Sequence, residues 1–232
     1  MRVAIMQPYF LPYIGYYQLI AAADIFVVYD NIKYTKKGWI NRNRMLLNGA
    51  DATFSLPLKK DSDYLDIVQR EISPDFDRGK LLNQFRGAYG RAPLFSQAFP
   101  SLERAVRSED DNLFRYIHNS IVESCGYLGV GTEIRASSEI AADHDLKGQE
   151  RVIAICKALG ATTYVNAIGG LDLYAPADFN AEGIELKFIK SKPFEYAQFG
   201  NAFVPWLSIV DVMMFNSKDD ISGALLGNFE LI

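Results

Sequence analysis

The first thirty residues constrain the fold more than any other part of the chain. Residues 2–6 (RVAIM) and 25–29 (IFVVY) are short apolar runs typical of buried strands, and residues 14–23 between them have helical spacing. Pro8 and Pro12 exclude a helix directly after the first strand, so an ordered loop is expected there. Strand, loop, helix and strand in this order form a βαβ unit, which implies a parallel sheet with a right-handed crossover.

The same region mimics a membrane segment, because residues 3–23 carry no formal charge. Their number would suffice for a signal peptide or a transmembrane helix. The segment also contains two prolines, two glutamines and four tyrosines, and its polar groups would cost free energy in lipid without partners. No small-residue cleavage site follows a clean apolar run. We therefore expect a protein without membrane insertion, located in the cytoplasm.

The remaining chain continues the alternation of strands and helices. Strands are expected at 52–58, 67–72, 162–166 and 186–190, the first two as a hairpin, and helices at 79–89, 149–159, 206–215 and 220–226. A long helix is expected after a Ser108 cap, because apolar residues recur at helical spacing from Leu113 to Leu128. We predict a single α/β domain over residues 1–232, with a Rossmann-like parallel sheet and a helical insertion at about 75–130.

Charge and cysteine content limit the classes of partner. The chain has 232 residues, of which 24 are Lys or Arg and 28 are Asp or Glu, so its formal net charge is -4. Bulk nucleic-acid binding relies on a basic footprint, which a chain of this charge lacks. The two cysteines fit no metal or disulfide spacing, and Cys156 lies in an apolar helical pattern. A buried structural thiol in a reducing compartment is therefore expected.

The loop after the first strand is the first candidate for ligand binding. Residues 7–16 (QPYFLPYIGY) lead from that strand into a helix. In parallel α/β sheets, ligands bind outside the carboxyl ends of the strands, where a helix N-terminus offers free N–H groups. Polar side chains gathered in one loop need partners, whereas the apolar side chains of the same loop fit the core. We therefore single out Gln7 for substrate binding, and Tyr13 and Tyr16 for proton transfer.

The segment after the second strand concentrates positive charge at the same edge of the expected sheet. Five cations lie between Lys33 and Arg44, interleaved with aromatic residues and asparagines. Cations beside stacking surfaces suit a phosphate or diphosphate, although a solvated basic loop also fits part of the pattern. Asp30, at the end of the strand, is a third candidate for proton transfer. The predicted substrate-binding residues are Lys33, Tyr34, Lys37, Trp39, Asn41, Arg42 and Arg44.

Three further motifs are weaker. Ser137 and Ser138 can donate to a ligand or stabilise a turn. His144 lies between two aspartates, a pattern compatible with metal or acid–base chemistry but weak by itself, and we predict no metal site. Asp211 lies in an apolar stretch, where a carboxylate needs a cation or hydrogen-bond donors. A ligand-contacting turn is expected after the strand at 162–166, and its predicted substrate-binding residues are Asn166, Gly169, Gly170 and Tyr174.

Taken together, these segments resemble the WbqC-like family of bacterial proteins, which are encoded among genes for O-antigen and other surface polysaccharides. The resemblance rests on AIMQPYFLPYIGYYQLI, VYDNIKYTKKGWINRNR, RAPLF, the serine pair, RVIAIC, YVNAIGGLDLY and LSIVDVMMFN, in this order and nearly end to end. It implies an enzyme of polysaccharide biosynthesis that transfers an acyl or aminoacyl group to the amine of a nucleotide-linked amino sugar. The implied partners are that sugar and an activated acyl or aminoacyl donor.

The loop from Gln7 to Tyr16 is also distantly similar to the opening of HIGH-type nucleotidyltransferases, whose His-x-Gly-His motif lies over the nucleotide phosphates. Here Tyr13 and Tyr16 stand at both histidine positions, and a tyrosine cannot present an imidazolium at neutral pH. Two alternatives stay open beside acyl transfer: nucleotidyl or glycosyl transfer, and a non-catalytic module that binds a nucleotide sugar or RNA. No oligomeric state is predicted.

Overall fold

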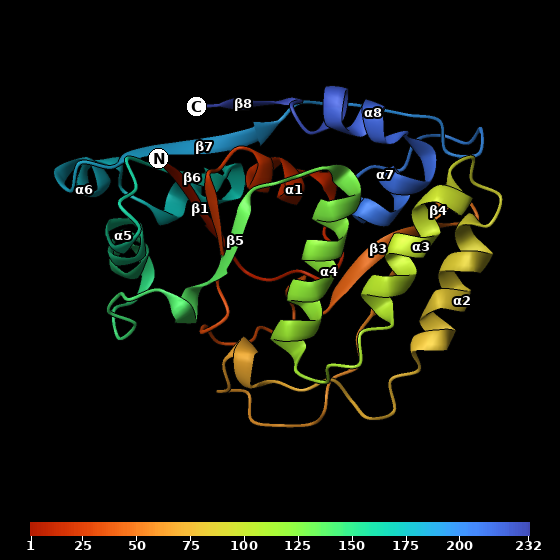
Figure 1. Cartoon of the computed structure of the whole chain (residues 1–232), viewed down its shortest axis with the longest axis horizontal. Coiled ribbons are helices and arrows are strands. Elements are labelled where there is room, and N and C mark those ends of the chain that lie inside the picture. Colours follow the sequence, from red (N-terminus) through yellow and green to blue (C-terminus); the bar gives the residue numbers. More distant parts are fainter.

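A computed structural model describes residues 1–232 and contains a six-stranded sheet with helices on both faces (Figure 1). The strand order is β5-β2-β1-β6-β7-β8, in which neighbouring strands are parallel except for the antiparallel edge strand β8. The strands are β1 (Arg2–Met6), β2 (Ile25–Val28), β5 (Glu133–Ala136), β6 (Thr163–Ala167), β7 (Glu185–Ser191) and β8 (Phe229–Leu231). The predicted α/β class with a Rossmann-like parallel sheet is therefore confirmed.

The central strands are apolar throughout because both of their faces are covered. All four residues of β2 are buried, and alternate side chains enter two different hydrophobic clusters. Phe26 and Val28 join the larger cluster together with α1 (Ile14–Ala21). Ile25 and Val27 join the smaller one together with α5 (Gly148–Ala158) and α6 (Pro176–Ala181). The uncharged N-terminal run thus forms β1, a loop and α1, and no helix of the structure has both the length and the apolar character needed to cross a membrane.

A separate hairpin, β3 (Arg42–Leu47) and β4 (Ala50–Ser55), follows the loop after β2. Asn48 and Gly49 close it with positive φ angles of 52° and 80°, as two-residue hairpin turns require. The predicted pairing of 52–58 with 67–72 is confirmed only at one end, where Leu58 and Ile72 form an isolated antiparallel bridge. The rest of it is wrong, because β4 pairs with β3 and residues Ile67–Gln69 form a short 3-10 helix, η1. The Asn-Gly pair was the signal for the correct partner.

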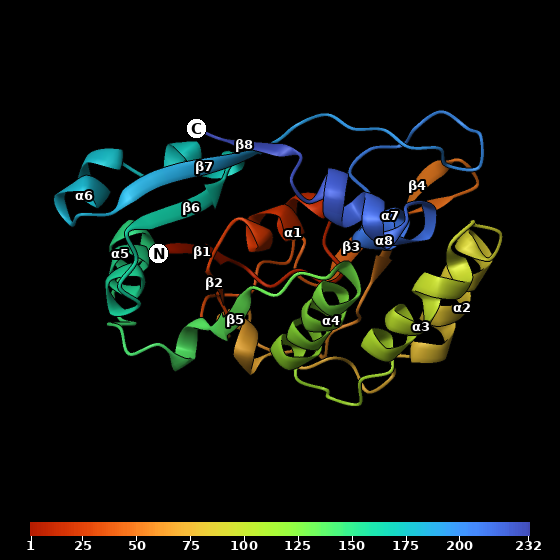
Figure 2. The same ribbon diagram turned by 45° about the horizontal axis from the view of Figure 1, so that its top comes forward.

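Three helices fill the predicted insertion range: α2 (Arg78–Tyr89), α3 (Phe95–Val106) and α4 (Leu113–Leu128). They lie together at the opposite end of the molecule from α5 and α6 (Figure 2). Pro100 lies inside α3 and concealed this helix in the sequence pattern.

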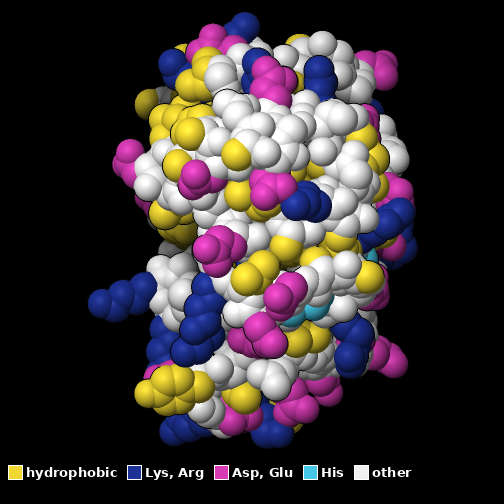
Figure 3. All heavy atoms as spheres, turned by 90° about the vertical axis from the view of Figure 1, so that its left-hand side faces the viewer, with side chains coloured by type: hydrophobic (Ala, Val, Ile, Leu, Met, Phe, Trp, Pro, Cys, Tyr) yellow, Lys and Arg dark blue, Asp and Glu magenta, His cyan; other side chains and the backbone are white.

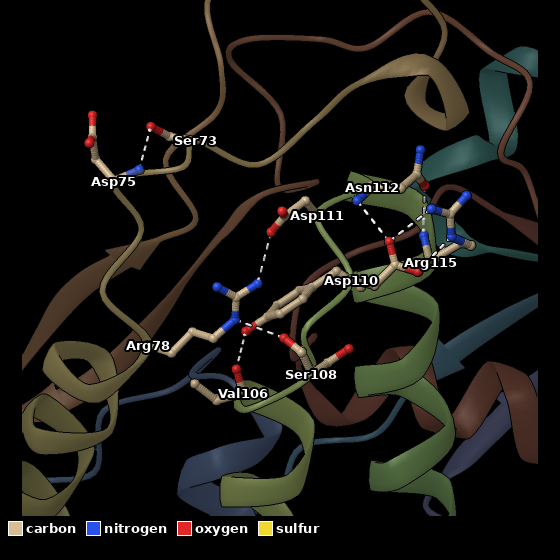
Figure 4. Close-up of polar contacts among 10 residues, drawn as sticks. Ser73, Asp75, Arg78, Val106, Ser108, Asp110, Asp111, Asn112 and Arg115 are labelled. Atoms are coloured by element: carbon tan, nitrogen blue, oxygen red, sulfur yellow. Dashed lines mark hydrogen bonds and ion pairs between the residues drawn. The ribbon is translucent and has the colours of Figure 1, made fainter.

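The predicted Ser108 cap of the long helix is wrong. The Asn112 side chain accepts the N–H of Arg115 and caps α4. The carbonyl of Ser108 instead accepts from Nε of Arg78 at 2.7 Å, while Nη2 of Arg78 donates to Asp111 at 3.1 Å (Figure 4). These contacts join the start of α2 to the loop that precedes α4.

The C-terminal part returns to the sheet through α7 (Ile209–Phe215), the short helix α8 (Lys218–Asp220), a π-helical turn (Ile221–Leu225) and β8. The predicted helix 206–215 begins three residues later than expected. Trp206 has a φ of 61°, which an α-helix excludes, and the Ser208 hydroxyl accepts the N–H of Val210 as the helix cap.

Candidate functional site

The strand order places a topological switch point at β1. β2 and β5 lie on one side of β1, whereas β6 and β7 lie on the other. In sheets of this kind ligands bind outside the carboxyl ends of the strands at that point. A cavity of about 790 Å³ lies there, lined by Tyr29 and Asn31 after β2, by the N-terminal turn of α5, and by Tyr174 at the end of η3 (Ile168–Leu173). We call this cavity the crevice.

Arg151 of α5 is the most buried cation of the crevice, with 9% of its surface exposed. Its Nη1 donates to the backbone oxygen of Asn31 at 3.1 Å, and its guanidinium carbon lies 5.0 Å from the centre of the Tyr29 ring. Its Nε has no hydrogen-bond partner, and it takes part in none of the ion pairs of the structure. A buried cation without an anion is costly, so an anionic ligand would complete this arrangement.

His144 also lines the crevice and is held at both ring nitrogens. Its Nε2 lies 2.9 Å from the backbone oxygen of Ile140, which only accepts, so Nε2 carries the proton. Its Nδ1 then accepts from Nδ2 of Asn31 at 3.1 Å and from Nη2 of Arg151 at 3.3 Å. This neutral tautomer leaves no free lone pair for a metal ion, so the geometry favours a role in positioning Arg151.

Asp30, Ser137 and Ser138, which were singled out separately in the sequence, come together at the carboxyl ends of β2 and β5. Asp30 Oδ1 accepts the N–H of Ser138 at 2.9 Å and lies 2.7 Å from Oγ of Ser137, while Oδ2 accepts from Oγ of Ser138 at 2.6 Å. Oγ of Ser137 also lies 2.6 Å from Oδ1 of Asn31. Asp30 and Ser137 are fully buried. These side chains hydrogen-bond to one another and so hold this edge of the sheet. Proton transfer by Asp30 and substrate binding by Ser137 and Ser138 stay predictions.

The loop after β1 holds its own tyrosines in place. The Tyr16 hydroxyl is buried and donates to the backbone oxygen of Gln7 at 2.9 Å, which fastens the loop to α1. Burial raises the pKa of Tyr16 well above its usual value, so this phenol is a poor proton acceptor at neutral pH. Tyr13 directly precedes α1, and its ring centre lies 5.9 Å from that of Trp206. None of these side chains lines the crevice, so their predicted roles in catalysis and binding remain predictions.

The loop after β1 and the segment after β2 lie against each other, as their places at one sheet edge predict. The N–H of Phe10 donates to the backbone oxygen of Ile40 at 2.9 Å, and Nδ2 of Asn43 donates to the backbone oxygen of Leu11 at the same distance. Lys33 reaches the crevice, where Tyr174 is also found. Tyr34 and Asn41 line a different cavity, while Lys37 is exposed and lines neither.

The two arginines of the basic segment form hydrogen bonds and an ion pair with nearby residues that do not line the crevice. Arg42 donates Nε and Nη2 to the backbone oxygens of Gly38 and Lys37, at 2.9 and 2.7 Å. Arg44 donates Nη2 to the backbone oxygen of Trp206 at 3.0 Å and pairs with Asp51.

Both guanidinium carbons lie 5.6 Å from the centre of the Trp39 ring. The structure therefore gathers Trp39, Arg42 and Arg44 into one stack outside the crevice, and their substrate contacts stay predictions.

In the turn after β6, the backbone of one of the two glycines lies close to the side chain of Asn166. Asn166 is buried at the end of β6, and its Oδ1 accepts the N–H of Ala167 at 2.8 Å. A Cβ atom at Gly170 would lie only 2.4 Å from Nδ2 of Asn166, whereas a Cβ at Gly169 would meet nothing within 4 Å. Gly170 is thus required by the position of Asn166, and Gly169 is not.

We expect Gly170→Ala to lower the free energy of unfolding by about 1–3 kcal/mol, because the added methyl group must displace the Asn166 amide from a packed position. Gly169→Ala is the matched control and should change it by less than about 0.5 kcal/mol. Urea unfolding followed by circular dichroism measures both values. Equal effects of the two substitutions would contradict the close approach.

Sequence reasoning passed over two residues on which the crevice depends, Arg151 and Asn31. A signal for Arg151 was present, because it lies four residues before the buried Ile155 and therefore on the buried face of its helix. Nothing in the sequence distinguished Asn31 from the other polar residues after β2. Its importance follows from the contacts of its side chain and backbone with His144 and Arg151.

Two comparisons with known proteins cover almost the whole chain. The model of the WbqC-like protein family matches residues 7–222, a range that includes every loop lining the crevice. The "Uncharacterized protein Rv1507c" of Mycobacterium tuberculosis (strain ATCC 25618 / H37Rv) is 26% identical over 220 residues, which are 93% of this chain and 93% of that relative.

Proposed function

The chain belongs to the WbqC-like protein family, and from this premise we propose that it is an enzyme of surface-polysaccharide biosynthesis. In this proposal it transfers an acyl or aminoacyl group to the amine of a nucleotide-linked amino sugar. The sugar nucleotide binds in the crevice with its diphosphate on Arg151. The second substrate is an activated acyl or aminoacyl donor.

The observation that carries this proposal is the buried, unpaired guanidinium of Arg151 at the carboxyl edge of the sheet. Lys33 and Lys147 line the same crevice, and the first turn of the 11-residue helix α5 adds unbonded N–H groups. A diphosphate supplies the negative charge that these groups lack. The volume of about 790 Å³ lies within the range of small-molecule sites, roughly 300–1,000 Å³.

The side chains of the crevice also suit amide formation. The amine nitrogen attacks the acyl carbon, a C–N bond forms, the amine proton passes to a base, and the leaving group departs with its bonding electrons. The carboxylates of Asp66 and Asp145 line the crevice and are the proposed proton acceptors. Most of the acceleration in such a reaction comes from holding the two substrates together, for which Tyr29 and Tyr174 offer ring faces.

The direct test is to incubate the protein with dTDP-linked amino sugars and a panel of acyl and aminoacyl donors, followed by mass spectrometry. We expect a mass gain on the sugar nucleotide equal to the acyl group minus one hydrogen. Binding without a mass gain for every donor would contradict transfer to the amine. Release of pyrophosphate from ATP and a sugar phosphate would instead support nucleotidyl transfer.

Arg151→Met should weaken the binding of the sugar nucleotide by about tenfold to a hundredfold, because it removes charge-assisted hydrogen bonds to the diphosphate. Isothermal titration calorimetry measures this change. Arg91→Met is the matched control, since Arg91 also lies over an aromatic ring without an ion pair but is exposed and far from the crevice lining. Unchanged affinity of a folded Arg151→Met variant would overturn the proposed site.

An RNA-binding module has less support. Figure 3 looks onto the end of the molecule where α5 and α6 lie, and there the basic side chains form one small group at the lower left and are otherwise interspersed with acidic and apolar ones. A cytoplasmic location is part of the proposal. It is supported by the two cysteines, which are free and buried, and whose thiol pKa values are raised by burial to about 12.

A further inference from the structure

A second buried arginine without a carboxylate partner follows η1. Arg70 has 4% of its surface exposed and takes part in none of the ion pairs. Its Nη1 donates to the backbone oxygen of Ser62 at 2.8 Å, and Nε has no partner. The edge formed by Nε and Nη2 is therefore unbonded within the protein. Nε is enclosed by the protein, whereas Nη2 makes no hydrogen bond and is not fully enclosed, so Nη2 is the atom left to hold a phosphate or a carboxylate.

Arg70 lines a cavity of about 380 Å³ that shares no lining residue with the crevice. The Tyr34 ring lies 4.9 Å from the guanidinium carbon of Arg70 and fixes its plane. Tyr34 is itself held, because its hydroxyl donates to Oδ1 of Asn41 at 2.8 Å and Nδ2 of Asn41 donates to the backbone oxygen of Leu56 at 2.7 Å. The guanidinium is thus positioned before any ligand arrives.

The lining of this cavity is mostly positive. Lys36, Lys59 and Lys60 line it together with Arg70, against one lining carboxylate, that of Asp61. Lys36 and Lys59 pair with Asp63 and Glu71 on the surface, whereas Lys60 is in no ion pair. Exposed pairs of this kind are weak and screened by salt, so their lysines can also contact a ligand.

We propose that the cavity at Arg70 is a second anion site, which binds the phosphate group of a small phosphorylated molecule. The phosphate oxygens accept from Nη2 of Arg70, with Lys60 at the entrance and the Tyr34–Asn41 pair as the wall. A buried arginine is expensive in the free protein, and a bound dianion offsets that cost. The site is separate from the crevice and does not depend on the reaction proposed there.

The test uses the full chain and inorganic pyrophosphate, observed through the Nε–H signals of the arginines in ¹H–¹⁵N NMR spectra. The signal missing from Arg70→Met identifies Arg70, and Arg70→Lys provides a second assignment if the methionine variant does not fold. We expect the Arg70 signal to shift and saturate, and Arg91 to stay unchanged. An unmoved Arg70 signal, or equal small shifts of all exposed arginines, would overturn the proposal.

Calorimetry then separates this site from the crevice. Arg70→Met should weaken one pyrophosphate-binding event by about tenfold or more and leave the other intact, while Arg151→Met should do the reverse. Titrations with inorganic phosphate and with acetate distinguish a phosphate site from a general carboxylate site, and saturation by acetate at equal affinity would contradict the phosphate assignment. A response of Arg70 alone supports the second site and removes support from the crevice, and a response of Arg151 alone does the opposite.

Discussion

Replacing Asp30 with alanine should lower the free energy of unfolding by about 2–4 kcal/mol, one of the largest effects expected for a polar residue in this protein. The carboxylate is fully buried and accepts from Ser137 and from both the backbone and the hydroxyl of Ser138. Removing it takes the acceptor away from the buried Ser137 hydroxyl and from the backbone N–H and hydroxyl of Ser138, at the ends of β2 and β5. Urea unfolding followed by tryptophan fluorescence measures the loss.

Asp30→Asn is the control that separates positioning from proton transfer. The asparagine oxygen can still accept from the backbone of Ser138, and its amide can donate to a hydroxyl oxygen, so the fold should keep its stability within about 1 kcal/mol. If Asp30 only holds the edge of the sheet, this variant keeps its activity once an assay exists. A stable variant that binds the ligand as tightly as the wild type but has lost activity by a factor of about a hundred or more would support Asp30 as the proton acceptor in place of Asp66 and Asp145.

Asp30→Ala should also weaken ligand binding in the crevice, although Asp30 does not line it. Oγ of Ser137 lies within hydrogen-bond distance of Oδ1 of both Asp30 and Asn31 and shares its one proton between them, and Asn31 in turn contacts both His144 and Arg151. Loosening Ser137 therefore releases the group that orients the guanidinium. This link is tested by measuring the free energy of unfolding and the ligand affinity of the same Asp30→Ala sample. An unchanged affinity in the destabilised variant would show that the crevice does not depend on Asp30.

The elements that were predicted correctly are those with a strong local pattern. β1, α1 and β2 follow from two continuous apolar runs and a helical spacing within thirty residues, and the α/β class follows from them. The β3–β4 hairpin was missed because Arg42–Leu47 begins with three polar residues and was grouped with the basic segment before it. The spacing of apolar residues can indicate a strand, but it does not show which other strand pairs with it. Here Asn48-Gly49 marked the turn of the hairpin.

The sequence predicted the edge of the sheet at which the candidate site lies, but it did not predict the contacts between the residues of the site. Residues that follow β2, β5 and β6 do meet at the carboxyl ends of the strands, as the parallel sheet requires. The cations at 33–44 do not form the single cluster that was predicted. Arg42 and Arg44 belong to a strand, β3, and lie on one of its faces, while Asn43 is buried on the other. The two arginines that are buried without an anion could not be recognised, since burial depends on packing between distant segments.

Asp211 in α7 is the other buried carboxylate without a cation. Its Oδ2 accepts from the Tyr196 hydroxyl and from Nε2 of Gln198, both at 2.7 Å, and its Oδ1 has no partner. It takes part in no ion pair and has no exposed surface. Burial raises the pKa of Asp211 above its ordinary value, because the charged form loses its hydration.

This raised pKa predicts a stability contribution that is lost as the pH rises. Between the pKa of the unfolded chain, about 3.9, and the higher folded value, the folded protein holds a proton that the unfolded chain releases. The free energy of unfolding therefore falls as the pH rises through that window. Asp211→Asn keeps an oxygen that accepts from Tyr196 and Gln198 but cannot ionise, so its stability relative to the wild type should increase from about pH 4 to about pH 8.

Asp211→Ala provides the contrast, because it removes the charge but leaves the Tyr196 hydroxyl and the Gln198 amide without their acceptor. It should lower the free energy of unfolding by about 1–3 kcal/mol at pH 4, where the raised pKa favours the neutral carboxyl, and by less at pH 8. Urea unfolding at a series of pH values measures both variants against the wild type. If the difference between the wild type and Asp211→Asn does not change with pH, Asp211 has an ordinary pKa in the folded protein, and water or a cation must reach its unpartnered oxygen.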